Sequence, residues 1–387
     1  MPDHAFLELI DAQTRGGTLY CGGYDLHPQQ DVQRGAWDAN MAVYGFQNGG
    51  QIAYKTERYD FYNRVVALEG LKGTARERYA GLLAAIEDYL CYVAEISVLK
   101  CGLFVFKTQW GFYVQFGPAG AFLLQRLRRK FQELEATTGC RIIVILDCKP
   151  GDIATTQAAY FTGFMGSLME QWGIDHAPFD FDVINPAPWM GRDVLVLEEK
   201  GRLGLGLKLL RQGKCLIYVN KTSNPSGPEY QDLLVKAGNE EMALFMLNAL
   251  HAHQMSEEYG LHHEEVSQFG LVVGATRTCD GSIRRMFPWY TGLHPGFGAQ
   301  SLGKDPLSPF RKVILELRRD GRWNGFGGVH SSSRNHLFAW QKQYGGSGQV
   351  ENLEQDLVAA VRKHRTLEEE AFNLPEVIDA GIDYPFS

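Results

Sequence analysis

The chain has 387 residues, of which 45% are hydrophobic and 21% charged, and its formal net charge is −7 at pH 7. This composition is typical of a globular protein with a large core, and the acidic balance argues against a nucleic-acid-binding surface. No segment approaches the ~18 apolar residues of a membrane span, and residues 1–11 lack a basic region followed by an apolar core. We therefore expect a cytoplasmic protein, and the seven scattered cysteines, without a C-x-x-C pair, are expected to be reduced.

Short apolar segments alternate with amphipathic segments along the chain. Strands are predicted at residues 18–22, 102–107, 141–147, 181–185, 215–220, 270–274, 290–294 and 325–330. Helices are predicted near residues 76–95, 119–137, 154–172, 192–212, 239–259, 278–286 and 305–320, and Thr74 with Glu77 would form a capping box at the start of the first. Strands that are apolar on both faces belong in a parallel sheet. Eight such units predict one α/β domain over residues 1–387, a (β/α)8 TIM barrel.

Two regions lie outside this alternation. Residues 40–72 are rich in aromatic side chains, with apolar positions alternating around an Asn-Gly-Gly sequence at 48–50, and they predict a β-hairpin inserted after the first strand. Residues 341–387 form a C-terminal extension in which a charged helix near 351–371 is expected to pack on the outside of the barrel. Neither region is assigned any chemistry.

Polar residues follow the predicted strands at their carboxyl ends, where the loops of such a barrel form one shared face. They are Asp25, Lys107, Asp147, Lys149, Asp152, Asn185, Thr222, Ser223, Asn224, Thr276, the sequence HPGFGAQ at 294–300, and Arg334. Each has an ordinary explanation alone, since D-x-K-x-x-D occurs by chance, P-G-x-G can be only a turn, and a single arginine is usually a surface residue. Their common placement favours a site, because surface charge has no reason to gather at one end of every strand.

These side chains divide into three chemical groups. Backbone amides around Gly296 and Gly298, together with Arg334, would bind a phosphate. Neutral donors and acceptors suited to a flat, amide-rich ring are Ser223, Asn224 and Gln300. The third group is an alternating charge array formed by Lys107, Asp147, Lys149 and Asp152. An acid at ~4 Å stabilises a lysine's charge by roughly 4 kcal/mol at an effective dielectric near 20, so the lysines would stay cationic and could protonate a carbanion.

Seven stretches carry a resemblance to a known family, and they occur in family order between residues 22 and 339. They are FKTQWGFYVQFGPAG, LDCKPGDIATTQAAY, VINPAPWMGRD, VNKTSNPSGPEYQDL, GLVVGAT, HPGFGAQ and SSSRNHLFA. The sequence resembles the orotidine 5'-phosphate decarboxylases, in the branch with a D-x-K-x-G-D-I signature. The resemblance implies decarboxylation of orotidine 5'-monophosphate to UMP, the last step of de novo pyrimidine nucleotide synthesis, without metal or organic cofactor.

The resemblance also implies a role for each matching residue. Lys149 would protonate C6 of the pyrimidine, Asp147 would face the departing carboxylate, and Lys107 would brace the array and contact the ribose. In a homodimer, Asp152 and Thr156 would reach the ribose in the neighbouring subunit's site. The residues expected to bind substrate are Asp25, Thr156, Asn185, Ser223, Gly296, Gly298, Gln300 and Arg334, where Asp25 would bind ribose hydroxyls, Ser223 the pyrimidine edge, and Gln300 with Arg334 the phosphate.

The chain departs from the family pattern at several positions, and two other functions remain open. Pro150 stands where this branch has arginine, GAQSLG replaces G-A-Q-G-G, and the insertion at 40–72 is unexpected. A related group of barrel decarboxylases acts on keto-sugar phosphates with Mg²⁺, but it has a glutamate in the segment that holds Lys107. The other alternative is a nucleotide-binding barrel without activity.

Two further patterns are interpreted as structural. His251 and His253 do not share a helix face, and no metal ligands are assigned. The glycines of GRLGLG at 201–206 lack a preceding strand and the G-x-G-x-x-G spacing of a dinucleotide site.

Overall fold

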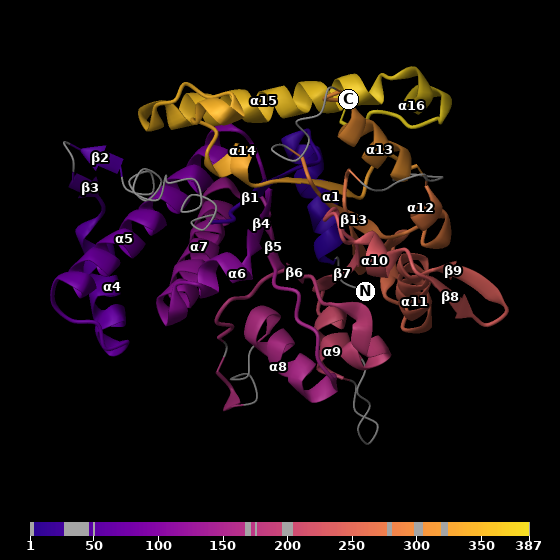
Figure 1. Cartoon of the computed structure of the whole chain (residues 1–387), viewed down its shortest axis with the longest axis horizontal. Coiled ribbons are helices and arrows are strands. Elements are labelled where there is room, and N and C mark those ends of the chain that lie inside the picture. The colour runs from indigo at the N-terminus through magenta and orange to yellow at the C-terminus, as the bar shows by residue number, and fades with distance from the viewer. Residues whose placement is uncertain are drawn as a thin grey trace.

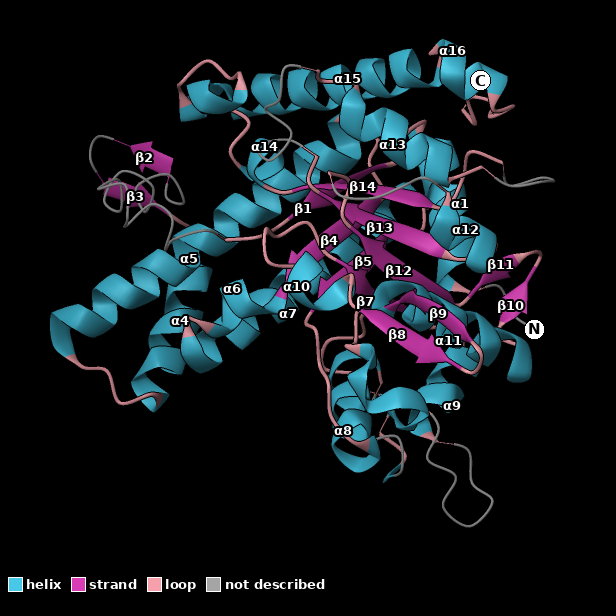
Figure 2. Ribbon diagram, turned by 45° about the vertical axis from the view of Figure 1, so that its right-hand side comes forward, coloured by secondary structure: helices cyan, strands magenta, loops and turns pink. Residues whose placement is uncertain are grey.

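Eight parallel strands close into a barrel in the computed structural model, which describes residues 4–26, 46–48, 51–166, 172–174, 176–195, 204–276, 281–297, 305–318 and 324–386. The strand order around the wall is β1-β14-β13-β12-β7-β6-β5-β4 (Figures 1 and 2). The strands are β1 (Tyr20–Gly23), β4 (Val105–Gln109), β5 (Ile143–Asp147), β6 (Val183–Ile184), β7 (Cys215–Lys221), β12 (Phe269–Val273), β13 (Thr291–Pro295) and β14 (Gly328–Ser332). The predicted (β/α)8 barrel is confirmed, because each of these strands overlaps a predicted one.

Helices lie between the strands, on the outside of the barrel (Figure 2). They include α5 (Gly73–Glu95), α7 (Gly117–Thr138), α8 (Ala154–Met165), α9 (Leu205–Arg211), α11 (Leu244–Glu258), α12 (Ser282–Met286) and α13 (Ser308–Glu316). The predicted capping box is wrong, since α5 begins at Gly73 after Lys72 and its cap makes no side-chain hydrogen bond. The helix predicted from 239 is also wrong at its start, because β9 (Glu240–Ala243) pairs there with β8 (Leu234–Ala237).

The N-terminal helix α1 (Ala5–Gly16) closes the amino-terminal end of the barrel. Its apolar side chains, including Phe6 and Ile10, join a core cluster with inward-facing strand residues such as Ile145 and Ile217. The backbone amide of Ala5 donates to the carbonyl of Gly213 (2.8 Å), just before β7. The floor of the barrel is therefore filled with apolar side chains, and only its opposite end is available for a site.

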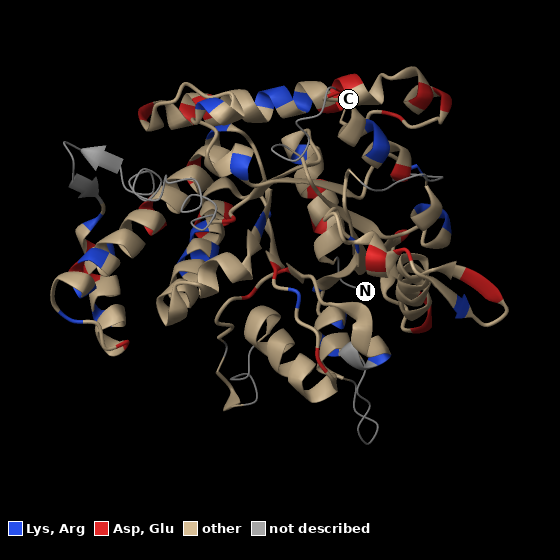
Figure 3. Cartoon of the chain, viewed as in Figure 1, with Lys and Arg blue, Asp and Glu red and all other residues tan. Residues whose placement is uncertain are grey.

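The two added regions differ in structure. In the insertion, β2 (Phe46–Asn48) pairs antiparallel with β3 (Gln51–Ala53), and residues 56–68 form the helix α4 (Thr56–Leu68), which packs on α5. The hairpin prediction therefore does not extend to residues 56–68. The C-terminal helix α15 (Leu353–Phe372) lies along the outside of β1 and α13, with basic and acidic segments along its length (Figure 3).

The part of the chain that the structure describes contains no helix with both the length and the apolar character needed to cross a membrane.

Candidate active site

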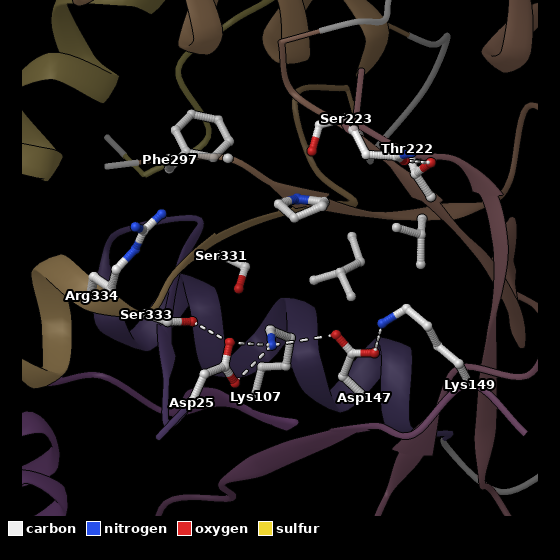
Figure 4. A pocket seen from close by; sticks show the side chains of 15 residues that line it. Asp25, Lys107, Asp147, Lys149, Thr222, Ser223, Phe297, Ser331, Ser333 and Arg334 are labelled. Atoms are coloured by element: carbon white, nitrogen blue, oxygen red, sulfur yellow. Dashed lines mark hydrogen bonds and ion pairs between the residues drawn. The ribbon is translucent and has the colours of Figure 1, made fainter. Parts of the chain in front are cut away.

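A cavity of about 350 Å³ opens at the carboxyl-terminal end of the barrel strands. It is lined by Asp25, Lys107, Asp147, Lys149, Thr222, Ser223, Asn224, Val272, Leu293, Pro295, Gly296, Phe297, Ser331, Ser333 and Arg334. Charged side chains from β1, β4 and β5 form one wall, and polar side chains from the loop after β7 face them (Figure 4). The volume is that of a site for a small organic ligand.

The charged wall is a continuous chain of ion pairs. Lys107 Nζ lies 3.1 and 3.0 Å from the two carboxylate oxygens of Asp25 and 3.5 Å from Asp147 Oδ2. Lys149 Nζ pairs with the other oxygen, Asp147 Oδ1 (Figure 4). Charge therefore alternates in the order Asp25, Lys107, Asp147, Lys149. The Lys107 side chain is only 5% exposed, whereas that of Lys149 is 45% exposed, so Lys149 is the cation with room to meet a ligand.

Asp25 is positioned by the loop after β14. Ser333 Oγ donates a hydrogen bond to Asp25 Oδ2 (2.6 Å). The two loops approach each other closely here, and only glycine fits at position 23. A Cβ added to Gly23 would lie 2.1 Å from Ser333 Oγ. The sequence placed Asp25 among ribose ligands and did not identify Ser333. In the sequence, Ser333 was marked only by the serine-rich stretch at the end of the last predicted strand.

Asn185 supports the loop that carries the reactive charges. Its Nδ2 donates to Asp147 Oδ1 (2.7 Å), and its Oδ1 accepts from the backbone amides of Cys148 (2.8 Å) and Lys149 (3.1 Å). Lys149 has a φ of 47°, a conformation that is uncommon for a lysine and that these hydrogen bonds hold in place. Asn185 is fully buried and is absent from the cavity lining. Asn185 therefore supports Asp147 from outside the lining of this cavity, and its contact with substrate stays a prediction.

The array fixes the protonation of its buried members. Burial alone would raise the pKa of Asp147, but Lys107, Lys149 and the hydrogen bonds from Lys149 and Asn185 lower this pKa to about 2. Burial alone would lower the pKa of Lys107, and its two acidic neighbours, Asp25 first, raise it above the usual value instead. At neutral pH the wall therefore presents an ionised Asp147 carboxylate beside the Lys107 ammonium.

The facing wall offers neutral polar groups. Thr222 Oγ1 accepts from Gln231 Nε2 (2.7 Å) and donates to Asn224 Oδ1 (2.5 Å), which orders the loop after β7. Ser223 lies close to β12, because a Cβ added to Gly274 would lie 2.8 Å from its backbone nitrogen. Ser223 and Asn224 line the cavity as predicted from the sequence, opposite the charged wall.

One end of the cavity is suited to an anion. Arg334 begins the short helix α14 (Arg334–Leu337), and its side chain lies on the same side of the cavity as Phe297 (Figure 4). Gly296 has a φ of 118°, which favours glycine, and its backbone borders the cavity. Two predicted residues of this group, Gly298 and Gln300, lie outside the described residues.

Asp152 and Thr156 do not line the cavity of their own chain. Asp152 is half-buried after the Lys149 turn, where its Oδ1 accepts from the amide of Ile153 (2.7 Å), and Thr156 is exposed on α8. Within one chain the fourth member of the charge array is therefore Asp25, and the predicted array with Asp152 is not formed there.

A closed (β/α)8 barrel with an ionised charge array and an anion-binding end at the mouth of its strands defines a barrel enzyme. No family model matches the chain. Among curated relatives, the orotidine 5'-phosphate decarboxylase of Rhodopirellula baltica is 29% identical over 293 residues, which cover 74% of this chain and 84% of the relative. The orotidine 5'-phosphate decarboxylase of Nocardioides sp. is 30% identical over 223 residues, covering 56% of this chain and 69% of the relative.

Solved structures agree on the fold. The orotidine 5'-monophosphate decarboxylase of Plasmodium berghei has a TM-score of 0.58 and 14% identity, covering 96% of this chain and 100% of that one. The OMP decarboxylase of Leishmania donovani has a TM-score of 0.54 and 19% identity over the same shares. These likenesses concern the fold alone, and the family follows from the curated relatives. The chain belongs to the orotidine 5'-phosphate decarboxylase family.

Proposed function

We propose that this protein decarboxylates orotidine 5'-monophosphate to UMP without a metal ion or organic cofactor in the chemical step. The observation that carries the proposal is the ion-pair chain from Asp25 to Lys149, in which an ionised Asp147 lies between a buried and an accessible lysine. The names of the curated relatives give the substrate.

In the proposed step the bond between C6 and the substrate carboxylate breaks, and CO₂ leaves. The electron pair of that bond remains on C6 and takes a proton from the ammonium of Lys149, giving UMP and a neutral amine that regains its proton from water. Lys149 suits this role because its ammonium is partly exposed at the cavity and is paired only through one oxygen of Asp147. A positioned proton donor acts on charge that develops in the transition state.

Asp147 would oppose the substrate carboxylate. Its low pKa keeps it ionised, so two carboxylates would face each other until CO₂ departs. Lys107 and Asn185 hold Asp147 and prevent it from turning away, since both of its oxygens are engaged. Preorganisation of this kind requires no rearrangement at the moment of reaction.

The remainder of the cavity would bind the nucleotide. Arg334 and the amides around Gly296 would hold the phosphate, with Gln300 and Gly298 beside them, and Ser223 would contact the pyrimidine edge. Asp25 and Lys107 would contact the ribose. These roles come from the match to the family motifs, and the cavity lining supports them for Asp25, Lys107, Ser223, Gly296 and Arg334.

We also propose a homodimer in which Asp152 and Thr156 complete the neighbouring subunit's site. The loop that holds Asp152 is tied to the loop after β6, because the amide of Ala187 donates to the carbonyl of Pro150 (2.8 Å). Nearby apolar side chains are unusually accessible, with Ile153 60% and Trp189 46% exposed. Exposed apolar side chains gathered beside a site mark an interaction surface.

A Mg²⁺-dependent decarboxylase of keto-sugar phosphates is the second candidate. Asp25 and Asp147 are the carboxylates that could hold Mg²⁺ here, but the ammonium of Lys107 already lies 3.0–3.5 Å from both. A divalent cation would have to share that space with a buried positive charge, which is electrostatically unfavourable.

The deciding experiment follows orotidine 5'-monophosphate by its loss of ultraviolet absorbance, with and without EDTA. Turnover that EDTA does not change supports the proposal. Turnover that EDTA abolishes and Mg²⁺ restores would contradict the metal-free chemical step. Tight binding of UMP by a folded protein without turnover would indicate a nucleotide-binding barrel and would refute the proposal.

A further inference from the structure

A second cluster of ionisable side chains lies on the outer side of the barrel wall, between β14 and α15. His330 comes from β14, and His364 and Glu368 come from α15, where their spacing of four residues places them on one helix face. Glu368 Oε2 lies 3.3 Å from His330 Nδ1 and 3.6 Å from His364 Nε2. One ligand atom from each residue can be chosen so that all three lie within 4.8 Å of one another.

The two imidazoles lie close to Glu368, but their contacts with it are poorly oriented for hydrogen bonding. Within the described residues, both ring nitrogens of His330 and Nε2 of His364 are buried without an adequately oriented hydrogen-bond partner. Glu368 is completely buried, and it accepts from the amide of Leu19 (3.0 Å) and the hydroxyl of Thr18 (3.1 Å). Buried imidazole nitrogens without well-oriented partners are costly. His330 Nδ1 and His364 Nε2, both within 3.6 Å of Glu368 Oε2, therefore require an explanation.

The surroundings of the cluster are apolar and aromatic. His330 stacks on Phe297 with ring centroids 4.2 Å apart, and His364 packs against Tyr20 at 4.5 Å and Phe310 at 4.7 Å. Such a shell holds the imidazoles in place and keeps water out.

We propose that His330, His364 and Glu368 bind one divalent transition-metal ion, Zn²⁺ by ligand chemistry, and that this ion fastens α15 to the barrel wall. Two imidazoles and a carboxylate are a common protein ligand set for zinc. The ligand atoms are already close together, so small side-chain movements would bring all three to zinc-binding distances of about 2.0–2.2 Å. The ion would bind one ring nitrogen of each imidazole and balance the buried carboxylate.

This site is separate from the catalytic chemistry but adjoins it. Phe297, which stacks on His330, also lines the catalytic cavity, on the side that holds Arg334. Zinc would thus hold both α15 and the wall against which Phe297 packs. The rival explanation is a proton shared between Glu368 and the two imidazoles, which would neutralise part of the charge without a metal.

The test measures metal content in protein purified without a histidine tag. By elemental analysis we expect about one zinc per chain in wild type, and nearly complete loss in His364→Ala and in Glu368→Gln. His262→Ala is the matched control, because His262 lies in β10 (His262–His263), outside the cluster, and is expected to retain the zinc. Turnover is not the readout, so this test and that of the proposed decarboxylation fail independently.

A second measurement requires no variant. Wild type is stripped with a chelator and titrated with Zn²⁺, then with Co²⁺. We expect a rise in the melting temperature, slower amide hydrogen exchange in α15, and the visible absorption of four-coordinate Co²⁺. Wild type that is purified without metal and shows no melting shift with added Zn²⁺ would overturn the proposal and indicate the shared proton. Zinc that persists in both cluster variants would overturn it equally.

Discussion

The two lysines of the charge array are expected to contribute differently: Lys149 mainly to turnover and Lys107 mainly to folding stability. Lys149→Ala removes a side chain that is 45% exposed, and Asp147 keeps its contacts with Lys107 at 3.5 Å and Asn185 at 2.7 Å. An exposed ion pair contributes about 0–1 kcal/mol, so the melting temperature should change little. Loss of a general acid lowers turnover by roughly 10²- to 10⁴-fold, equivalent to about 3–5 kcal/mol.

Lys107→Ala is expected to reduce folding stability far more than Lys149→Ala does. Its ammonium lies between two carboxylates and is only 5% exposed, so its removal leaves Asp25 and Asp147 without their shared counter-ion. Breaking a buried ion pair in this way costs about 3–5 kcal/mol of folding free energy. Lys107→Ala should therefore unfold at a much lower denaturant concentration than Lys149→Ala.

The assay combines urea unfolding, single-turnover decarboxylation and calorimetric titration with UMP. Lys100→Ala is the matched control for Lys149→Ala, because Lys100 is also exposed and paired, 3.8 Å from Glu354, but lies outside the cavity. The control should lose neither stability nor turnover, and Lys149→Ala should still bind UMP. The reasoning is refuted if Lys149→Ala keeps turnover within about tenfold of wild type, or if it is destabilised as much as Lys107→Ala.

Arg334→Ala should raise KM and lower kcat/KM more than kcat, because it would bind a phosphate remote from C6; equal loss of kcat and kcat/KM in steady-state kinetics would contradict this role. The inactive variants Lys149→Ala and Asp152→Ala should restore activity when mixed, since one site of a mixed dimer would be intact, and no recovery despite demonstrated subunit exchange would assign Asp152 to its own chain. Asp147 has a folded pKa of about 2, below its unfolded value of about 3.9, so its contribution is present above pH ~4 and lost as pH falls toward 2. Acid should therefore reduce wild-type stability by roughly 2.5 kcal/mol relative to Asp147→Asn in chemical denaturation, and identical pH profiles would exclude this linkage.

The sequence by itself determined the barrel and the position of its reactive residues along each strand. Short segments such as 143–147, apolar on both faces and ending in a charged residue, specify a buried parallel strand whose last side chain reaches the mouth. Lys107, Asp147 and Lys149 could therefore be assigned to one face, because the carboxyl ends of parallel strands meet there. Local pattern and strand periodicity suffice for such predictions.

Only the tertiary structure decided which distant side chains meet. Barrel closure pairs β1 with both β4 and β14, and this brings Asp25 to Lys107 and Ser333 although they are far apart in the chain. Asn185 follows β6, and the pairing of β6 with β5 brings its side chain to Asp147.

The cluster of His330, His364 and Glu368 was likewise absent from the sequence analysis. The spacing of His364 and Glu368 on one helix was a visible signal, but their partner lies on a strand more than thirty residues away. Contacts of this kind depend on how helices and strands pack at distances of a few ångströms. Residue pattern within one element carries no information on that packing.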